Sequence, residues 1–287
     1  MTQLVHTRKE LDALVAGRPG GVGVVMTMGA LHDGHRELIR VARKRCDLIV
    51  VTVFLNPLQF GPNEDLSRYP KTLEPDVALC TTEQVDFVFA PSVEEVYPGG
   101  GPPLVRVSAG PIGDVLEGAS RPGHFDGVLT VVAKLLHITR PDFAYLGQKD
   151  AQQLLLIRQM VADLDFPCEV VAVPTVREPS GLALSSRNGY LSAEDRDVAV
   201  ALSRALRAGA AAAAGGPDAV RRAAAAVIVA EPGVIPDYLV LVDPATLHDV
   251  PNDFAGVALL AVAARVGTTR LIDNVTVELA TVELAGA

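Results

Sequence analysis

The amino-acid sequence predicts an α/β fold, a Rossmann-like doubly wound parallel sheet with a smaller C-terminal mixed α/β domain. Short apolar runs alternate with helical patterns between residues 23 and 173, which is typical of a parallel sheet. The runs, for example residues 48–54, are apolar on both faces, as expected when helices cover both sides of the sheet. After Asn188 the composition becomes rich in alanine. We therefore expect two domains, residues 1–188 and residues 189–287.

The expected elements follow one another along the chain. In the first domain, strands at residues 23–27, 48–54, 86–90, 143–146 and 169–173 alternate with helices at residues 34–45, 73–84, 127–139 and 150–164. In the second domain, Gly215 and Gly216 separate two helices at residues 192–214 and 217–230. Strands at residues 237–242, 257–262 and 269–273 complete the second domain.

The charge and the apolar runs of the chain disfavour several classes of partner. The 287 residues include 34 acidic and 25 basic side chains, and the net charge of −9 disfavours sequence-independent binding to nucleic acid or acidic membranes. The longest apolar run, residues 257–264, is far shorter than the roughly twenty residues of a membrane-spanning helix. A small anionic substrate stays compatible with this charge, because a local pocket can be positive on a negative protein.

The expected compartment is the cytoplasm. Charged residues interrupt the first fifteen positions, which therefore lack the apolar middle of a secretory signal. Cys46, Cys80 and Cys168 are odd in number and widely spaced in apolar surroundings, which favours buried reduced thiols over a disulfide or zinc framework.

Four polar clusters follow the predicted strands, at residues 28–35, 56–61, 147–153 and 174–188. Ligands of open parallel sheets bind outside the carboxyl ends of the strands. We therefore expect the four clusters to converge on one edge of the sheet.

His32 and His35 open a predicted helix three positions apart, so both imidazoles can lie on one side beside backbone N–H groups. The helix dipole favours phosphate there, and Gly29 and Gly34 allow a ligand to approach the backbone. The alternative is a solvated helix start with two histidines by coincidence. A zinc site is disfavoured, because two histidines are too few ligands and the H-E-x-x-H spacing is absent.

Lys149 follows a predicted strand at the start of a helix, and its compact positive charge suits a reacting phosphoryl group. Asp150 is either a ligand contact or a helix cap. Gln153, one turn further along the same face, can hydrogen-bond a polar substrate. Residues 177–188, which combine turn chemistry with hydroxyls and a guanidinium, are either a mobile polyphosphate clamp or a polar loop between domains.

Together these residues resemble the nucleotidyltransferases with an H-x-G-H signature, here His32-Asp33-Gly34-His35. In this comparison Ser185-Ser186-Arg187 takes the place of the lysine-containing second motif of class I aminoacyl-tRNA synthetases. Longer blocks are similar to the pantothenate synthetase family, at residues 27–35, 54–70, 121–140, 147–159 and 173–192. One departure is Met26, which stands where the family commonly has proline and puts the local geometry of the strand exit in doubt.

The resemblance implies an AMP-forming ligase that condenses (R)-pantoate with β-alanine to give pantothenate. The pantoate carboxylate attacks the α-phosphate of ATP, which releases pyrophosphate and gives pantoyl adenylate, and the β-alanine amine then displaces AMP. Mg²⁺ is expected as the companion of ATP, usually with several waters and few protein ligands. The resemblance also implies a homodimer.

The resemblance assigns roles residue by residue. The implied catalytic residues are His35, His32, Lys149 and Arg187. The implied ATP contacts are Met28, Gly29, Ala30, Leu31, His32, Asp33, Gly34, His35, Gly147, Gln148, Lys149, Asp150, Val176, Leu184, Ser185, Ser186 and Arg187. Gln59 and Gln153 are implied to hold pantoate, with Gln59 also near β-alanine, and Asp76 is an implied metal contact.

The chemistry leaves two sets of roles open. Attack by an already ionised carboxylate needs little proton transfer, so positioning and charge neutralisation supply most of the acceleration. His35 is therefore either a proton donor or a hydrogen-bond donor to the shifting charge. Arg121, His124 and Asp126 either line an enclosure that keeps water from the adenylate, with the second domain as a lid, or cap the helix that follows.

Two other functions compete with the ligase. A different H-x-G-H adenylyltransferase would transfer AMP to a phosphate and needs a further anion site, whereas Gln59 and Gln153 suit a hydroxy acid better. A nucleotide-binding regulatory module would bind ATP without releasing AMP, and the full set of histidines, lysine and arginine disfavours it.

Overall fold

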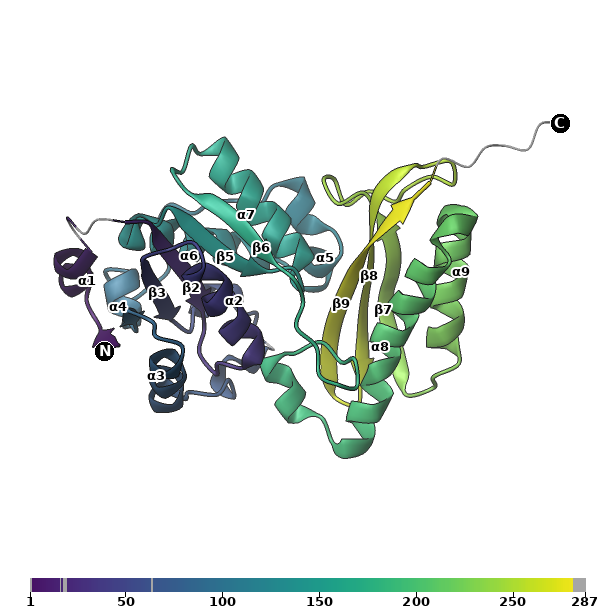
Figure 1. Ribbon diagram of the computed structural model, residues 1–287, viewed down its shortest axis with the longest axis horizontal. Helices are drawn as coiled ribbons and strands as arrows, with labels where there is room; N and C mark the ends of the chain where they lie inside the picture. Colours follow the sequence, from purple (N-terminus) through teal and green to yellow (C-terminus); the bar gives the residue numbers. More distant parts are fainter. Residues whose placement is uncertain (1, 16, 18–19, 63, 281–287) are drawn as a thin grey trace. The chain divides into compact units, whose positions relative to one another are not determined.

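Figure 1 shows the computed structural model of the protein, which describes residues 2–15, 17, 20–62 and 64–280. The chain divides into two compact units, residues 1–148 with 152–174, and residues 149–151 with 175–287. Each unit contains a sheet of its own.

The first unit is built on a six-stranded parallel sheet in the order β1-β4-β3-β2-β5-β6. Its strands are β1 (Gln3–Val5), β2 (Val22–Thr27), β3 (Leu48–Val53), β4 (Phe87–Phe89), β5 (Phe143–Gly147) and β6 (Glu169–Val173). Its helices are α1 (Arg8–Val15), α2 (Asp33–Arg43), α3 (Leu73–Thr82), α4 (Val93–Val96), α5 (Glu117–Ser120), α6 (His124–Thr139) and α7 (Ala151–Asp163). The predicted parallel α/β fold is confirmed.

The strand order reverses beside β2. The chain leaves β2 through β3 and β4 on one side, and it then returns to β5, which pairs with β2 on the other side. In doubly wound sheets, ligands bind at this reversal, outside the carboxyl ends of the two strands. The loops that follow β2 and β5 are therefore the first place to search for a ligand site.

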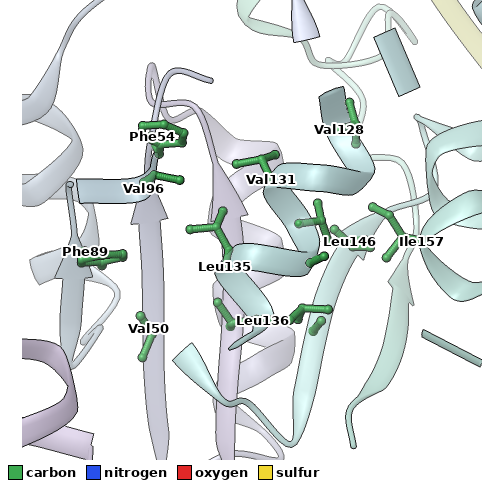
Figure 2. Packing of buried hydrophobic residues seen from close by; sticks show 14 of the residues in the cluster. Val50, Phe54, Phe89, Val96, Val128, Val131, Leu135, Leu136, Leu146 and Ile157 are labelled. Atoms are coloured by element: carbon green, nitrogen blue, oxygen red, sulfur yellow. The ribbon is translucent and has the colours of Figure 1, made fainter. Parts of the chain in front are cut away.

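Helices cover both faces of this sheet, and the alternation of side chains along the strands shows how. Val24 of β2 shares a core with α1, α6 and α7, whereas the next residue, Val25, shares a second core with α2 and α3. Figure 2 shows the first of these cores, where Val131 and Leu135 of α6 lie among side chains of the sheet such as Val50. Strands that are apolar on both faces are thus buried on both faces.

The second unit combines a three-stranded antiparallel sheet, in the order β7-β8-β9, with two helices. Its elements are α8 (Ala193–Ala211), α9 (Gly216–Val229), β7 (Val234–Val242), β8 (Gly256–Val266) and β9 (Thr269–Leu279). The Ser192 hydroxyl caps α8 by accepting a hydrogen bond from the Asp195 N–H. All three strands are longer than the sequence pattern indicates. In β8 the missed residues include two alanines, which carry no strand signal of their own.

The domain boundary between residues 188 and 189 stays a prediction. The contacts group residues 175–188 with the second unit, because two ion pairs hold this segment there. Arg177 pairs with Asp273 at 2.6 Å, and Arg196 pairs with Glu178 at 2.6 Å.

Among the described residues, no single helix is long and apolar enough to cross a membrane. Helix α8 together with residues 213–229 passes that test only as a pair bent by 54°. The three cysteines are free, with Cys46 and Cys80 buried and Cys168 half-buried.

A glycine allows α6 to pack against the turn at Pro57–Gln59. A Cβ added at Gly127 would overlap the Leu58 carbonyl oxygen, which is backbone and moves only with the turn. We expect Gly127→Ala to lower the free energy of unfolding by about 1–3 kcal/mol, measured by urea denaturation followed by circular dichroism. Gly101→Ala is the control, because its added Cβ meets open space. Equal stability of the two variants would contradict the overlap.

Candidate active site

The chain turns sharply where β2 ends. Gly29 and Ala30 have positive φ angles of 93° and 52°, and the Gly29 N–H donates to Thr27 Oγ1 at 3.2 Å. Asp76 of α3 accepts hydrogen bonds from the N–H groups of Ala30, at 3.1 Å, and Leu31, at 2.8 Å. The turn leads directly to His32, the N-cap residue of α2.

His32 and His35 cap the start of α2 reciprocally. The His32 N–H donates to Nδ1 of His35 at 3.2 Å, and the Gly34 N–H donates to Nδ1 of His32 at 3.1 Å. The two ring centroids are 4.1 Å apart. Because each Nδ1 accepts a hydrogen bond, the proton of each neutral ring is assigned to Nε2. The pair therefore supplies two Nε2–H donors. The backbone N–H groups of His32 and Gly34, which were expected to bind an anion, donate to the two rings instead.

The protonation state of His35 bears on the two roles left open by the sequence. Burial, with a smaller contribution from the neighbouring His32, lowers the pKa of His35 to about 3. The ring is then neutral at pH 7 and carries no acidic proton to transfer. The geometry and the charge both favour a hydrogen-bond donor over a proton donor.

Gln59 lies against Met28, so two of the predicted ligand residues of the first unit come together. Its Nε2 is 3.2 Å from the Met28 sulfur, and its Oε1 accepts a hydrogen bond from Asn56 Nδ2 at 2.9 Å. Asn56 is 1% exposed, and its Oδ1 accepts a hydrogen bond from the Tyr97 hydroxyl at 2.8 Å. Asn56 and Tyr97 are therefore supporting residues that the sequence analysis missed. An asparagine directly before Pro57 is a helix-start signal that identifies Asn56.

The backbone of Gln59 is held by a second set of side chains. His124 and Arg121 both donate to the Gln59 carbonyl oxygen, at 2.8 Å from Nδ1 and 3.3 Å from the guanidinium. Arg121 also forms a bidentate ion pair with Glu64, at 2.7 Å for both contacts, and contacts His124 Nε2 at 2.8 Å. Because arginine only donates, His124 Nε2 accepts and the proton of the ring lies on Nδ1. Burial and the Arg121 charge lower the pKa of His124 to about 4.

The capping alternative for residues 121–126 is wrong. The N-cap position of α6 is Gly123, and the helix start has no side-chain cap. Asp126 instead accepts a hydrogen bond from the Ala109 N–H at 2.8 Å. Arg121 and His124 thus support the Gln59 turn, while Asp126 fastens a neighbouring segment.

The segment after β5 contains two adjacent glutamines with different environments. Gln152 is 6% exposed and is tied to backbone groups of Ile112, Val115 and Glu117 at 2.8 to 3.0 Å. Gln153 is half-buried, and its side chain has no hydrogen-bond partner within the residues that the structure describes. Only Gln153 of the two has an amide available to a ligand.

The remaining predicted ATP contacts of the first unit lie at strand and helix ends. Gly147 is the last residue of β5, and the exposed Gln148 donates its N–H to the Val173 carbonyl oxygen at 2.8 Å. Asp33 is exposed in the first turn of α2, with Arg36 at 3.4 Å. These residues follow β2 and β5, the two strands at the reversal of strand order.

In the second unit, a hairpin groups the other predicted ATP contacts. Residues 177 and 183 form an antiparallel bridge, and the Leu184 N–H donates to the Val176 carbonyl oxygen at 3.0 Å. Ser185 Oγ accepts a hydrogen bond from the Arg187 N–H at 3.2 Å, next to Ser186. These contacts give the segment a defined hairpin, and its role as a polyphosphate clamp stays a prediction.

Lys149 and Asp150 precede α7 and belong to the second unit. The Lys149 carbonyl oxygen accepts a hydrogen bond from Asn274 Nδ2 of β9 at 2.8 Å, and the Lys149 side chain is half-buried. Asp150 is exposed.

A protein site for a metal is not evident in the described part of the chain. No group of three His, Cys, Asp or Glu side chains is arranged there to hold an ion. Both oxygens of Asp76 already accept backbone N–H groups, and the residue is 2% exposed, which disfavours a metal there. Its role as a metal contact stays a prediction.

A parallel sheet with reversed strand order carries the H-x-G-H helix start at the reversal, which is where ligands of doubly wound α/β sheets bind. A family model described as pantoate-beta-alanine ligase matches residues 3–276, and the chain belongs to this family. The pantothenate synthetase of Salinispora arenicola is 60% identical over 283 residues, which cover 98% of this chain and 99% of that protein. That of Streptomyces avermitilis is 53% identical over 326 residues, covering 96% and 97%.

Solved structures agree with this membership. Pantothenate synthetase from Thermus thermophilus has a TM-score of 0.90 at 50% identity and covers 95% of this chain and 98% of its own. Pantoate-beta-alanine ligase from Francisella tularensis, complexed with beta-gamma ATP and beta-alanine, has a TM-score of 0.78 at 35% identity, with 96% and 97% covered. The chain is therefore an enzyme, a ligase that joins pantoate to β-alanine, and the predicted family is confirmed.

His35 and His124 should make the folded protein less stable in acid. Both pKa values lie below the ordinary value of 6.5 in the folded state, so as the pH falls the unfolded chain takes up these protons first. Their contribution to the free energy of unfolding is complete above pH 6.5. It is lost as the pH falls towards 4 for His124 and towards 3 for His35, with a slope of up to ~1.4 kcal/mol per pH unit for each histidine. Urea denaturation at a series of pH values measures this slope. His35→Gln should reduce it, and an unchanged slope would contradict the assignment.

Proposed function

We propose that this chain makes pantothenate from (R)-pantoate and β-alanine by an AMP-forming route through pantoyl adenylate. A carboxylate oxygen of pantoate attacks the α-phosphorus of ATP, and the bond to pyrophosphate breaks. The amine of β-alanine then attacks the acyl carbon, loses a proton, and AMP leaves. The observation that carries the proposal is the reciprocal His32–His35 cap at the strand-order reversal of a pantoate–β-alanine ligase fold.

Binding and neutralising ATP would be the task of two groups of residues. In the first unit, the turn from Met28 to Leu31 and the Nε2–H donors of His32 and His35 lie outside the carboxyl end of β2. In the second unit, Lys149 and the segment from Val176 to Arg187 provide an ammonium, hydroxyls and a guanidinium, groups that bind phosphate oxygens well. Positioning and charge neutralisation would then supply the acceleration.

Pantoate would be held by the amides of Gln59 and Gln153. A primary amide both donates and accepts, so it suits the hydroxyls and the carboxylate of a hydroxy acid. The Gln59 amide is already oriented by Asn56 and touches only a weak acceptor, the Met28 sulfur, which a ligand oxygen can replace. The Francisella tularensis relative is complexed with beta-gamma ATP and beta-alanine, which supports β-alanine as the second substrate.

Mg²⁺ would enter with ATP, held mainly by phosphate oxygens and water, as is common for this ion. It would stabilise negative charge on the leaving pyrophosphate. A cytoplasmic location rests on the composition of the sequence, and a homodimer rests on the resemblance. A role of residues 189–287 as a lid that protects the adenylate from water is a further proposal.

Two sequential additions test the proposed route. The protein is incubated with ATP, Mg²⁺ and pantoate, and pyrophosphate is measured; β-alanine is then added, and AMP is measured. We expect pyrophosphate only when pantoate is present, and AMP in solution only after β-alanine is added. ATP binding without either product would favour a regulatory module, and pyrophosphate release driven by a phosphate acceptor instead of pantoate would favour the other adenylyltransferases.

The role of His35 as a neutral donor predicts a large difference between two substitutions. His35→Gln keeps an acceptor for the His32 N–H and an N–H donor for the ligand, as glutamine does in capping boxes. His35→Ala removes both, and we expect it to slow pyrophosphate formation on the order of 100-fold or more. His35→Gln should stay within about tenfold of the unsubstituted enzyme. If His35 transfers a proton instead, the two variants will be equally slow.

The ammonium of Lys149 should matter to the first half-reaction and little to folding. Lys149→Ala removes a half-buried charge that no described side chain pairs with in an ion pair, so we expect pyrophosphate formation to fall on the order of 100-fold. Circular dichroism and the urea midpoint should stay close to those of Lys9→Ala, an exposed-lysine control on α1. A near-normal rate in Lys149→Ala would show that another group neutralises the phosphates.

A further inference from the structure

The carboxylate of Asp76 is a buried charge that the proposed reaction does not use. Asp76 lies in the first turn of α3 and is 2% exposed. Its Oδ1 accepts the Leu31 N–H at 2.8 Å, and its Oδ2 accepts the Ala30 N–H at 3.1 Å and the Thr72 hydroxyl at 3.2 Å. No described Lys, Arg or His side chain forms an ion pair with it. A buried carboxylate is tolerated only with such partners, and here two of the three are backbone groups of the ligand loop.

The two backbone donors form an anion-binding arrangement that the protein fills itself. Successive N–H groups directed at one anion make a concave nest of the kind that often binds phosphate. In this chain the nest of Ala30 and Leu31 is occupied by the carboxylate of Asp76. These two N–H groups are therefore committed to holding the loop, so the turn would contact ATP through its other atoms, and the phosphates would be bound by other donors such as the Nε2–H groups of His32 and His35.

The loop needs such support because its conformation is unfavourable. Ala30 has a φ of 52°, in the left-handed region that residues with a Cβ rarely adopt. Gly29, with a φ of 93°, fits closely: a Cβ there would lie 3.1 Å from Asp76 Oδ2 and 3.2 Å from Val53 Cγ1. The turn is thus confined between α3 and β3, and Asp76 supplies the hydrogen bonds that keep it there.

We propose that Asp76 is a positioning residue for adenylate formation, which acts by holding the turn between β2 and α2. The turn has Met28, the neighbour of Gln59, on one side and His32, the N-cap of α2, on the other. A displaced turn would move both at once, and misplacement of about 1 Å costs a reaction up to on the order of 100-fold. This inference rests on the proposed function.

Positioning and metal binding predict different responses to Mg²⁺. A metal ligand changes the Mg²⁺ concentration that gives half-maximal rate when it is replaced, and added Mg²⁺ restores the rate. Replacement of a positioning residue lowers kcat/KM for ATP at every Mg²⁺ concentration.

The test compares Asp76→Asn with Asp142→Asn. Asparagine keeps one acceptor oxygen at position 76 and turns the other into a donor that faces a backbone N–H. Asp142 is the matched control, because its Oδ2 also accepts a backbone N–H, that of Val22 at 2.7 Å, at the opposite end of β2. Pantoate-dependent pyrophosphate formation gives kcat and KM for ATP at saturating Mg²⁺, and a Mg²⁺ titration gives the half-saturating concentration.

We expect Asp76→Asn to lower kcat/KM for ATP on the order of 10- to 100-fold, with an unchanged half-saturating Mg²⁺ concentration. Asp142→Asn should stay within about twofold of the unsubstituted enzyme. Kinetics of Asp76→Asn that match those of Asp142→Asn overturn the inference, and recovery at high Mg²⁺ overturns it in favour of a metal ligand.

A milder variant keeps the test decisive if Asp76→Asn does not fold. Thr72→Val removes only the hydroxyl that orients Oδ2, and we expect a severalfold loss in kcat/KM for ATP with unchanged Mg²⁺ dependence. An unaffected Thr72→Val enzyme then overturns the inference. Failure of the proposed function is recognised separately, because the unsubstituted enzyme would then make no pyrophosphate from ATP and pantoate.

Discussion

The left-handed turn at Gly29 and Ala30 is the constraint on which the chemistry of the first unit depends. The central strand of the sheet must end and a helix must begin within a few residues, and the two histidines of the motif start that helix. The turn is closed by a hydrogen bond to Thr27 and by the Asp76 carboxylate, so its shape is set by groups from β2 and α3. A strained backbone such as this turn persists because several surrounding groups fix its conformation.

The architecture of the first unit follows closely from the sequence, because its strands are apolar on both faces and only a parallel sheet between helices buries them so. The short strand β1 escaped prediction, since three residues carry too little periodicity. The C-terminal strands were found but not their ends. For β8 the reason is that alanine does not distinguish strand from helix.

The site was predictable in its residues and much less so in its contacts. The H-x-G-H spacing indicates that His32 and His35 share one side of a helix start, but the reciprocal hydrogen bonds depend on side-chain rotamers that no spacing fixes. Asn56 and Tyr97 are 41 positions apart, and their bond exists only once the sheet has formed. Sequence patterns report local periodicity, whereas such supporting contacts are products of tertiary packing.

The cap of α2 also shows a conflict between helix stability and chemistry. Serine or aspartate at an N-cap, with glutamate three residues later, stabilises a helix start more than a pair of imidazoles does. Sequence optimisation for thermal stability would therefore select these residues at positions 32 and 35, and it would delete both Nε2–H donors. In this fold, the start of α2 should be excluded from any such redesign, because the residues that stabilise this helix start most would remove the donors that the reaction needs.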